Sequence, residues 1–231
     1  MAFNFQTFKT RALTALLFIA VMLTGLLWNF WSFLVLFTVI HFGCWFEFVK
    51  LMKKIYAVKY LRYCLLGLIY ITMPCVLILC LYKQAGDINL HDTYIVLAEG
   101  SIPLIIIASI WINDTMAYLV GSFIGKTPLS KISPKKTIEG TLGGIVLCVG
   151  VIGLLMHFVF YNGVATFFCM VLAAICSIFG TLGDLLESKL KRMADVKDSG
   201  NFMPGHGGFL DRFDSLLVAV PFVWLYIKLF V

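Results

Sequence analysis

Charged side chains are scarce in this sequence. Asp, Glu, Lys and Arg make up 13% of its 231 residues, against 61% hydrophobic residues and a mean hydropathy of +0.97. Soluble domains carry about 25% charged residues, and half that share cannot cover a 25.9 kDa globule in water. The scarcity argues against a soluble enzyme, and with it against a water-soluble helical bundle, a disordered chain and a nucleic-acid-binding module.

Paired cysteines and internal repeats are also lacking. The seven cysteines lie in apolar stretches without a C-x-x-C pair, at Cys44, Cys64, Cys75, Cys80, Cys148, Cys169 and Cys176. This placement favours reduced cysteines in a membrane core and implies neither a disulfide framework nor a zinc site. Because no repeat or low-complexity linker divides the chain, we expect a single membrane domain over residues 1–231, with N-terminal spans in 1–100 and catalytic spans and cytoplasmic loops in 101–231.

The apolar runs predict an all-α, polytopic membrane protein. Residues 12–46 and 140–183 contain no charged side chain, and as single helices rising about 1.5 Å per residue they would far exceed a hydrocarbon core of about 30 Å. Each run must therefore form two spans, with turns at Trp28-Asn29 and at Tyr161-Asn162-Gly163. Single spans fit residues 63–82, 101–124 and 209–230, which brings the prediction to about seven transmembrane helices.

The basic residues predict the orientation. Seven spans place the two ends of the chain on opposite sides of the membrane, and a cytoplasmic N-terminus makes residues 1–11, 50–62, 126–139 and 188–212 the inner segments. These segments hold 16 of the 18 Lys and Arg residues, as expected for cytoplasmic loops. The asymmetry predicts a cytoplasmic N-terminus and explains the net charge of +6 without nucleic acid.

Half of the acidic residues cluster between positions 184 and 214, at Asp184, Glu187, Asp195, Asp198, Asp211 and Asp214. Asp184 and Glu187 are three residues apart and share a helical face, and Asp211 and Asp214 repeat that spacing in the next span. Antiparallel spans would bring up to four carboxylates together at the lipid–water boundary, where they suit a hard cation such as Mg²⁺. The alternative for each acid is a solvated helix end, or a first turn favoured by the helix dipole.

The loop between these acids combines cations with glycines. It carries Lys191, Arg192 and Lys197. These are followed by His206, which lies between Gly205 and the pair Gly207-Gly208. Backbone amides at such glycines can approach an anion closely. Cations, amides and acids for Mg²⁺ are what a nucleotide triphosphate site requires. A second basic loop over 126–139 points to the same kind of ligand, with anchoring to anionic lipid as the alternative.

Three further features carry weaker predictions. Asp114 lies inside a predicted span, where an acid is costly and usually functional, and its partner is left open between Arg212, a Lys and a metal. Glu47, at the inner end of a span, is expected to be a solvated boundary residue. Gly140 and Gly144 form a G-x-x-x-G pattern that favours helix packing over catalysis.

Residues 188–214 resemble the signature of the phosphatidate cytidylyltransferases, also called CDP-diglyceride synthetases. The matching residues are Ser188, Lys191-Arg192, Lys197-Asp198, Pro204, His206-Gly207-Gly208, Asp211-Arg212 and Asp214. The family's pattern also matches Asp114-Thr115, Ala117-Tyr118, Gly121, Gly125-Lys126, Ile132-Ser133-Pro134-Lys135-Lys136-Thr137, Glu139-Gly140, Gly183-Asp184-Leu185 and Glu187-Ser188. The similarity covers residues 110–230, with Met203 where the family usually has Leu, Ile or Phe, whereas residues 1–100 match only in hydropathy.

The resemblance implies an enzyme that transfers the cytidylyl group of CTP to phosphatidate, giving CDP-diacylglycerol and pyrophosphate. It implies Mg²⁺ bound by Asp184, Asp211 and Asp214, with K⁺ as a second cation, and Lys191 and Arg212 as further catalytic residues. The residues implied to bind substrate are Asp114, Lys126, Ser133, Lys135, Lys136, Ser188, Arg192, Lys197, Asp198, His206, Gly207 and Gly208. We further expect a homodimer in the bilayer of a bacterial inner membrane, with the active site on the cytoplasmic side and no nucleic-acid partner.

Two alternatives stay open. A CDP-archaeol synthase or a polyprenol kinase is a related CTP-using membrane enzyme, and the residues that would distinguish its lipid lie in generic apolar spans. A cation transporter built around Asp114 would place its ion site at the midplane between repeats. Half of the acids of this chain gather instead at one predicted side of the membrane, and the sequence contains no repeat.

Overall fold

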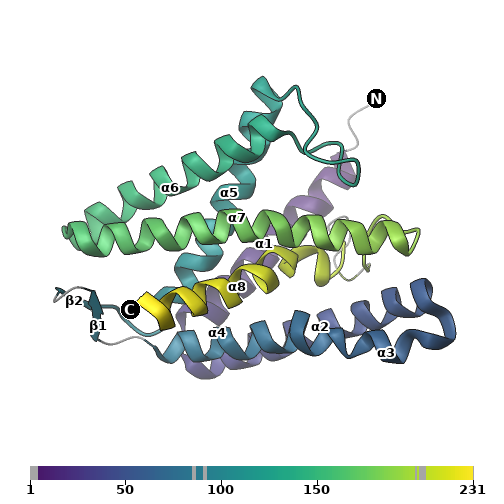
Figure 1. The fold of residues 1–231 in the computed structure, drawn as a ribbon, viewed down its shortest axis with the longest axis horizontal. Coiled ribbons are helices and arrows are strands. Elements are labelled where there is room, and N and C mark those ends of the chain that lie inside the picture. Colours follow the sequence, from purple (N-terminus) through teal and green to yellow (C-terminus); the bar gives the residue numbers. More distant parts are fainter. Residues whose placement is uncertain (1–4, 85–86, 91–92, 201, 203–206, 231) are drawn as a thin grey trace. The chain divides into compact units, whose positions relative to one another are not determined.

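The computed structural model of the chain describes residues 5–84, 87–90, 93–200, 202 and 207–230. Its helices are α1 (Phe5–Leu27), α2 (Phe30–Tyr56), α3 (Tyr60–Cys64), α4 (Met73–Lys83), α5 (Ser101–Ile124), α6 (Ile138–Phe160), α7 (Gly163–Met193) and α8 (Leu210–Phe230) (Figure 1). An antiparallel hairpin of β1 (Asp87–Leu90) and β2 (Thr93–Val96) lies between α4 and α5. The all-α prediction is confirmed, with this short hairpin as an addition.

Both turns predicted inside the long apolar runs are confirmed. Before α2, Asn29 Oδ1 accepts the Ser32 amide at 2.9 Å and Ser32 Oγ accepts the Asn29 amide at 3.1 Å. This reciprocal pair satisfies amides that the start of a helix leaves without partners. After α6, Tyr161 adopts a left-handed φ of 50° and Asn162 Oδ1 accepts the Val164 amide at 2.9 Å. Helix α7 therefore turns back beside α6, as Figure 1 shows.

The span predicted over residues 63–82 is not one regular α-helix. The chain passes from α3 through a π-helix at Leu68–Thr72 before α4 begins. The physical reason is Pro74, which lacks the amide that an α-helix would donate to the Tyr70 carbonyl. Thr72 Oγ1 accepts Trp45 Nε1 at 2.9 Å and lies 3.0 Å from His41 Nε2, so side chains of α2 hold this irregular turn.

Among the residues that the structure describes, five helices are long and apolar enough to cross a membrane. They are Phe30–Cys64, a range that comprises α2, a 3₁₀ turn at Ala57–Lys59 and α3, and Ser101–Ile124, Ile138–Phe160, Gly163–Met193 and Leu210–Phe230. Two shorter apolar helices cover Leu13–Leu27 and Leu68–Lys83. The chain is therefore a polytopic membrane protein. The total of seven spans and the cytoplasmic N-terminus stay predictions.

The chain divides into two compact units that alternate along the sequence. The first unit is Met1–Thr72 with Leu190–Phe213, and the second is Met73–Lys189 with Asp214–Val231. In the first unit α1 packs on α2, where the absence of a side chain at Gly25 makes room for Leu36. In the second unit α5 packs on α6, and the Phe179 ring of α7 stacks on Phe222 of α8 with centroids 3.6 Å apart. The single membrane domain stays a prediction.

Candidate active site

In the first unit, the signature loop connects the end of α7 to the start of α8; we use that name for residues 194–209. Lys191, in the last turn of α7, and Asp211, in the first turn of α8, form an ion pair with Nζ 2.6 Å from Oδ1. The two side chains are only 13% and 9% exposed. The structure thus brings together two residues that the sequence analysis selected separately, and it closes the loop with their contact.

The second oxygen of Asp211 organises the loop itself. Asp211 Oδ2 accepts the Ser199 amide at 2.9 Å and the Gly208 amide at 2.8 Å. Gly207 has a φ of +82°, and a Cβ there would lie 2.6 Å from Asp211 Oδ2, so only glycine fits this turn. The glycines were predicted to let backbone amides approach an anion, and in the described residues the anion they approach is this carboxylate.

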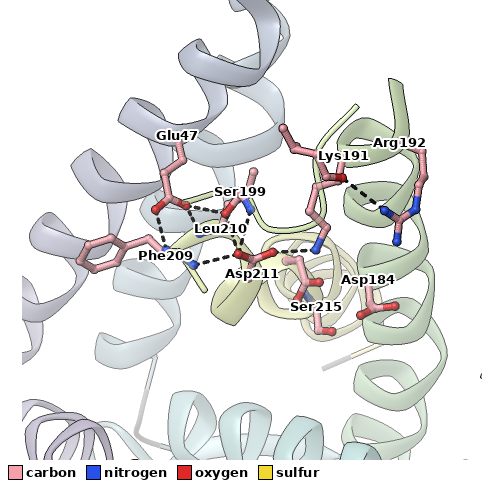
Figure 2. A network of polar contacts seen from close by, with 12 residues as sticks. Glu47, Asp184, Lys191, Arg192, Ser199, Phe209, Leu210, Asp211 and Ser215 are labelled. Atoms are coloured by element: carbon pink, nitrogen blue, oxygen red, sulfur yellow. Dashed lines mark hydrogen bonds and ion pairs between the residues drawn. The ribbon is translucent and has the colours of Figure 1, made fainter. Parts of the chain in front are cut away.

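Glu47 is also part of this network, which corrects the sequence analysis. We expected a solvated boundary residue, but the side chain is 4% exposed. Its Oε1 accepts the Phe209 amide at 3.0 Å, and its Oε2 accepts the Leu210 amide at 2.9 Å and the Ser199 hydroxyl at 2.6 Å (Figure 2). The partners are two backbone amides and one hydroxyl from a segment distant in sequence, which is why no local pattern around Glu47 indicated its burial.

Four other charged residues in or next to the signature loop lie at the surface. Arg192 is exposed and its Nη1 donates to the Val196 carbonyl at 3.3 Å. Lys197, Asp198 and Arg212 are exposed as well, and their substrate-binding and catalytic roles stay predictions. His206, with Pro204 and Met203, lies outside the described residues.

In the second unit, the loop over residues 126–137 places a lysine next to a carboxylate of α7. Lys136 Nζ lies 2.7 Å from Asp184 Oδ2 of α7, with side chains 33% and 28% exposed. Glu139, in the first turn of α6, holds the loop by accepting the amides of Lys126 at 3.1 Å and Thr127 at 3.1 Å. Of the two neighbouring lysines, Lys136 is therefore the one that this loop directs to an acid of α7, whereas Lys135 is exposed.

The same unit contains four of the predicted acids. Asp214 of α8 is 6% exposed and its Oδ1 accepts the Ser215 amide at 2.6 Å. It interacts electrostatically with Asp184, with Asp114 of α5 and with Lys136. A Cβ at Gly183 would lie 2.5 Å from the Asp214 carbonyl oxygen, so the backbones of α7 and α8 meet where these acids are carried. Glu187, one turn further along α7, is fully buried.

The glycines of α6 explain how α5 comes close to this cluster. Cβ atoms at Gly140 and Gly144 would lie 2.8 Å from the Ala117 carbonyl oxygen and 2.7 Å from Ala117 Cβ. The prediction that this G-x-x-x-G pattern serves helix packing is confirmed. Ala117 follows Asp114 by one turn, so the close approach fixes the segment of α5 that carries the acid.

The acids of the second unit offer oxygen donor atoms to a metal ion. Asp114, Asp184 and Asp214 offer carboxylate oxygens, the ligands that a hard divalent cation prefers. Over the part of the chain that the structure describes, no group of three or more His, Cys, Asp or Glu is arranged to hold a metal ion. The kind of donor atom thus suits Mg²⁺, whereas the described residues are not gathered into a metal site, and the assignment of ligands stays a prediction.

Two residues of the site were missed by the sequence analysis, Glu47 and Ser199. Ser199 follows directly after Lys197-Asp198, so its place next to a matched motif was an available signal. Glu47 offered only the weaker signal of an acid at the end of a long apolar run. All seven cysteines are free thiols in the structure.

Comparison with known proteins points to the same region of the chain as the motifs found in the sequence. The model described as the cytidylyltransferase family matches residues 91–230. The phosphatidate cytidylyltransferase of Bacillus subtilis (strain 168) is 48% identical over 122 residues, which cover 52% of this chain and 45% of that protein. Proteins of the same name from Staphylococcus saprophyticus and Staphylococcus aureus (strain COL) are 47% identical over 113 residues, covering 48% of this chain and 43% of theirs. The matched stretch spans somewhat less than half the length of these relatives.

Proposed function

This chain belongs to the cytidylyltransferase family, and from that membership we propose that it transfers the cytidylyl group of CTP to phosphatidate. The products would be CDP-diacylglycerol, which enters phospholipid biosynthesis, and pyrophosphate. One observation carries the proposal. Every charged residue that the sequence analysis selected for the site, from Asp114 to Asp214, lies within the residues that the family model matches.

The acids of the second unit support a metal-dependent reaction. Asp184 and Asp214 would hold Mg²⁺, with Asp114 near enough to interact with Asp214 electrostatically. Asp211, the third predicted ligand, belongs to the first unit. When bound, Mg²⁺ would neutralise charge on the phosphates of the nucleotide. A monovalent cation such as K⁺ is proposed as a second cation on the strength of the resemblance alone.

The cations support the transfer between two anionic substrates. In the proposed reaction a phosphate oxygen of the lipid attacks the α-phosphorus of CTP and pyrophosphate leaves, so like charges must approach each other. Lys136 and Lys191 are held by carboxylates at 2.7 and 2.6 Å, and this fixes where their ammonium groups lie. Exposed Arg192, Lys197 and Arg212 would bind the phosphates. Phosphatidate is already ionised near neutral pH, so no general base is needed.

The membrane setting follows from the same reasoning. Charged loops at the ends of apolar spans let a water-soluble nucleotide meet a lipid headgroup. We propose a bacterial inner membrane with the active site on the cytoplasmic side, since the named relatives are bacterial and 16 of 18 basic residues fall in the predicted inner segments. A homodimer is proposed from the resemblance.

The test is conversion by the purified protein in detergent or liposomes. Incubated with CTP and phosphatidate, it should form CDP-diacylglycerol, lose that activity on chelation with EDTA and regain it with Mg²⁺. Parallel reactions with an archaeal-type ether lipid and with a polyprenol would distinguish the related CTP-using enzymes. An absence of product from several phosphatidate species would overturn the proposal, and faster turnover of either other lipid would reassign the substrate.

A further inference from the structure

Glu47 lies in a part of the chain that the family model does not cover. The matched residues are 91–230, whereas Glu47 belongs to α2. Nevertheless its carboxylate is buried and receives three hydrogen bonds from residues of the matched region, from Ser199 and Phe209 of the signature loop and from Leu210, the first residue of α8. A residue outside the matched region thus takes part in the hydrogen bonding of the signature loop inside it.

The geometry around Glu47 is complementary to a carboxylate. The amides of Phe209 and Leu210 point at its two oxygens from the N-terminus of α8, at 3.0 and 2.9 Å. That end of a helix carries unsatisfied N–H groups and a partial positive charge, which stabilise an anion. The Ser199 hydroxyl adds a third donor at 2.6 Å. All three neighbours are donors, so a carboxylate satisfies each of them.

Three glycines make room for this contact. Cβ atoms on Gly200 and Gly208 would collide with the Glu47 carboxylate itself, and a Cβ on Gly43, one turn earlier in α2, would lie 2.5 Å from the Phe209 ring. The close approach of α2 and the signature loop therefore depends on missing side chains on both sides. Because protein interiors are close-packed, the absence of side chains at these glycines is what leaves space for the Glu47 carboxylate and the Phe209 ring.

Ser199 connects Glu47 to Asp211. Its hydroxyl has a single proton, and Glu47 Oε2 at 2.6 Å is closer to Ser199 Oγ than Asp211 Oδ2 at 3.0 Å. Its backbone amide donates to Asp211 Oδ2 at 2.9 Å. The Ser199 hydroxyl therefore donates to Glu47 while the Ser199 amide donates to Asp211, and Asp211 forms the ion pair with Lys191 (Figure 2).

We infer that Glu47 is a positioning residue that acts through Ser199 and the first amides of α8 to fix Asp211 and Lys191 for the reaction. The inference rests on the proposed function for its catalytic meaning, whereas the ordering of the loop can be measured without it. Glu47 touches no substrate in this role.

The test uses Glu47→Gln and Ser199→Ala in the full-length protein. Glutamine has the shape of glutamate, but its NH₂ group must face one of two backbone N–H groups and lose that hydrogen bond. We expect kcat to fall by roughly tenfold to a hundredfold, since small displacements of catalytic groups have effects of that size. The KM for CTP should change by less than about threefold, because the loss concerns the transition state.

The double variant shows whether Glu47 acts through Ser199. If it does, Glu47→Gln combined with Ser199→Ala loses much less activity than the product of the two single losses, because both changes break one connection. The matched control is Glu99→Gln, the same chemical change at an exposed position of the second unit, which should leave kcat unchanged. Multiplicative losses in the double variant would overturn the connection through Ser199.

Hydrogen exchange provides a readout that needs no activity. Peptides covering residues 199–211 should exchange faster in Glu47→Gln than in Glu99→Gln, with α6 unchanged in both. If the wild type makes no CDP-diacylglycerol, the proposed function fails, and this exchange alone decides whether Glu47 orders the loop. If Glu47→Gln does not fold, Ser199→Ala decides. Unchanged exchange and unchanged kcat in the folded variant would overturn the inference.

Discussion

Lys191 Nζ lies 2.6 Å from Asp211 Oδ1, and both side chains are largely buried. The sequence predicts separate roles for the two residues, phosphate binding for Lys191 and metal binding for Asp211. In the structure each neutralises the other, so the position of either depends on its partner. Removing one charge leaves the other unpaired in a place of low exposure, which is more costly than breaking a surface pair.

Asp211→Asn should abolish CDP-diacylglycerol formation, with a loss of at least about a hundredfold. The change removes the negative charge that holds Lys191 and that is predicted to bind metal. Asparagine keeps one oxygen for the amides of Ser199 and Gly208, so the protein should still fold. Initial rates with saturating CTP measure the effect, and thermal unfolding in detergent provides the control. Full activity in a folded variant would falsify both roles of Asp211.

Lys136→Met should lower kcat/KM by about tenfold or more, whereas Lys135→Met should have a clearly smaller effect. Only Lys136 is held by Asp184, at 2.7 Å, and is thereby fixed in position. The two lysines are adjacent in the sequence, and both substitutions remove the same positive charge. Because the pair is about one-third exposed, its loss should change stability by no more than about 1 kcal/mol. Equal losses for both variants would show that general positive charge matters instead of the ion pair.

Gly183→Ala should destabilise the protein by about 1–3 kcal/mol, the usual cost of overpacking. The added Cβ would lie 2.5 Å from the Asp214 carbonyl oxygen, forcing α7 and α8 apart in the second unit. Gly150→Ala is the matched control, since a Cβ on Gly150 of α6 has no neighbour within 4 Å. Unfolding midpoints of the two variants give the comparison. A stable Gly183→Ala protein with normal activity would contradict the close approach.

Cysteine labelling should find residues 126–139 on the cytoplasmic side. In a cysteine-free background, Lys131→Cys should resist a membrane-impermeant maleimide in intact cells and react once the cells are permeabilised. Glu99→Cys lies between the predicted spans 63–82 and 101–124, on the side opposite the predicted inner segments. It should react in intact cells and so shows that the reagent has access. Labelling of Lys131→Cys from outside would reverse the predicted orientation.

The sequence was a good guide to where helices begin and end. Asn29 and Asn162 are residues whose side chains cap a helix start, and both predicted turns were found at them. The span over residues 63–82 was less well predicted, because a proline near the start of a helix changes the backbone pattern without changing hydropathy. The pairing of Lys136 with Asp184 could not be predicted, since residues far apart in the chain form it.

Composition and local pattern by themselves determined that this protein is a polytopic membrane protein, that its charges concentrate in a few segments, and which segment resembles a cytidylyltransferase signature. These properties depend on residues near one another in the chain, through helix length, capping and motif spacing. The tertiary structure alone decided which charges meet. It buried Glu47 against the start of α8, joined Lys191 to Asp211 and Lys136 to Asp184, and used glycines to admit carboxylates. Contacts across such sequence distances arise only when packed helices bring backbone donors and side chains together, because an apolar surrounding requires each buried charge to find a partner.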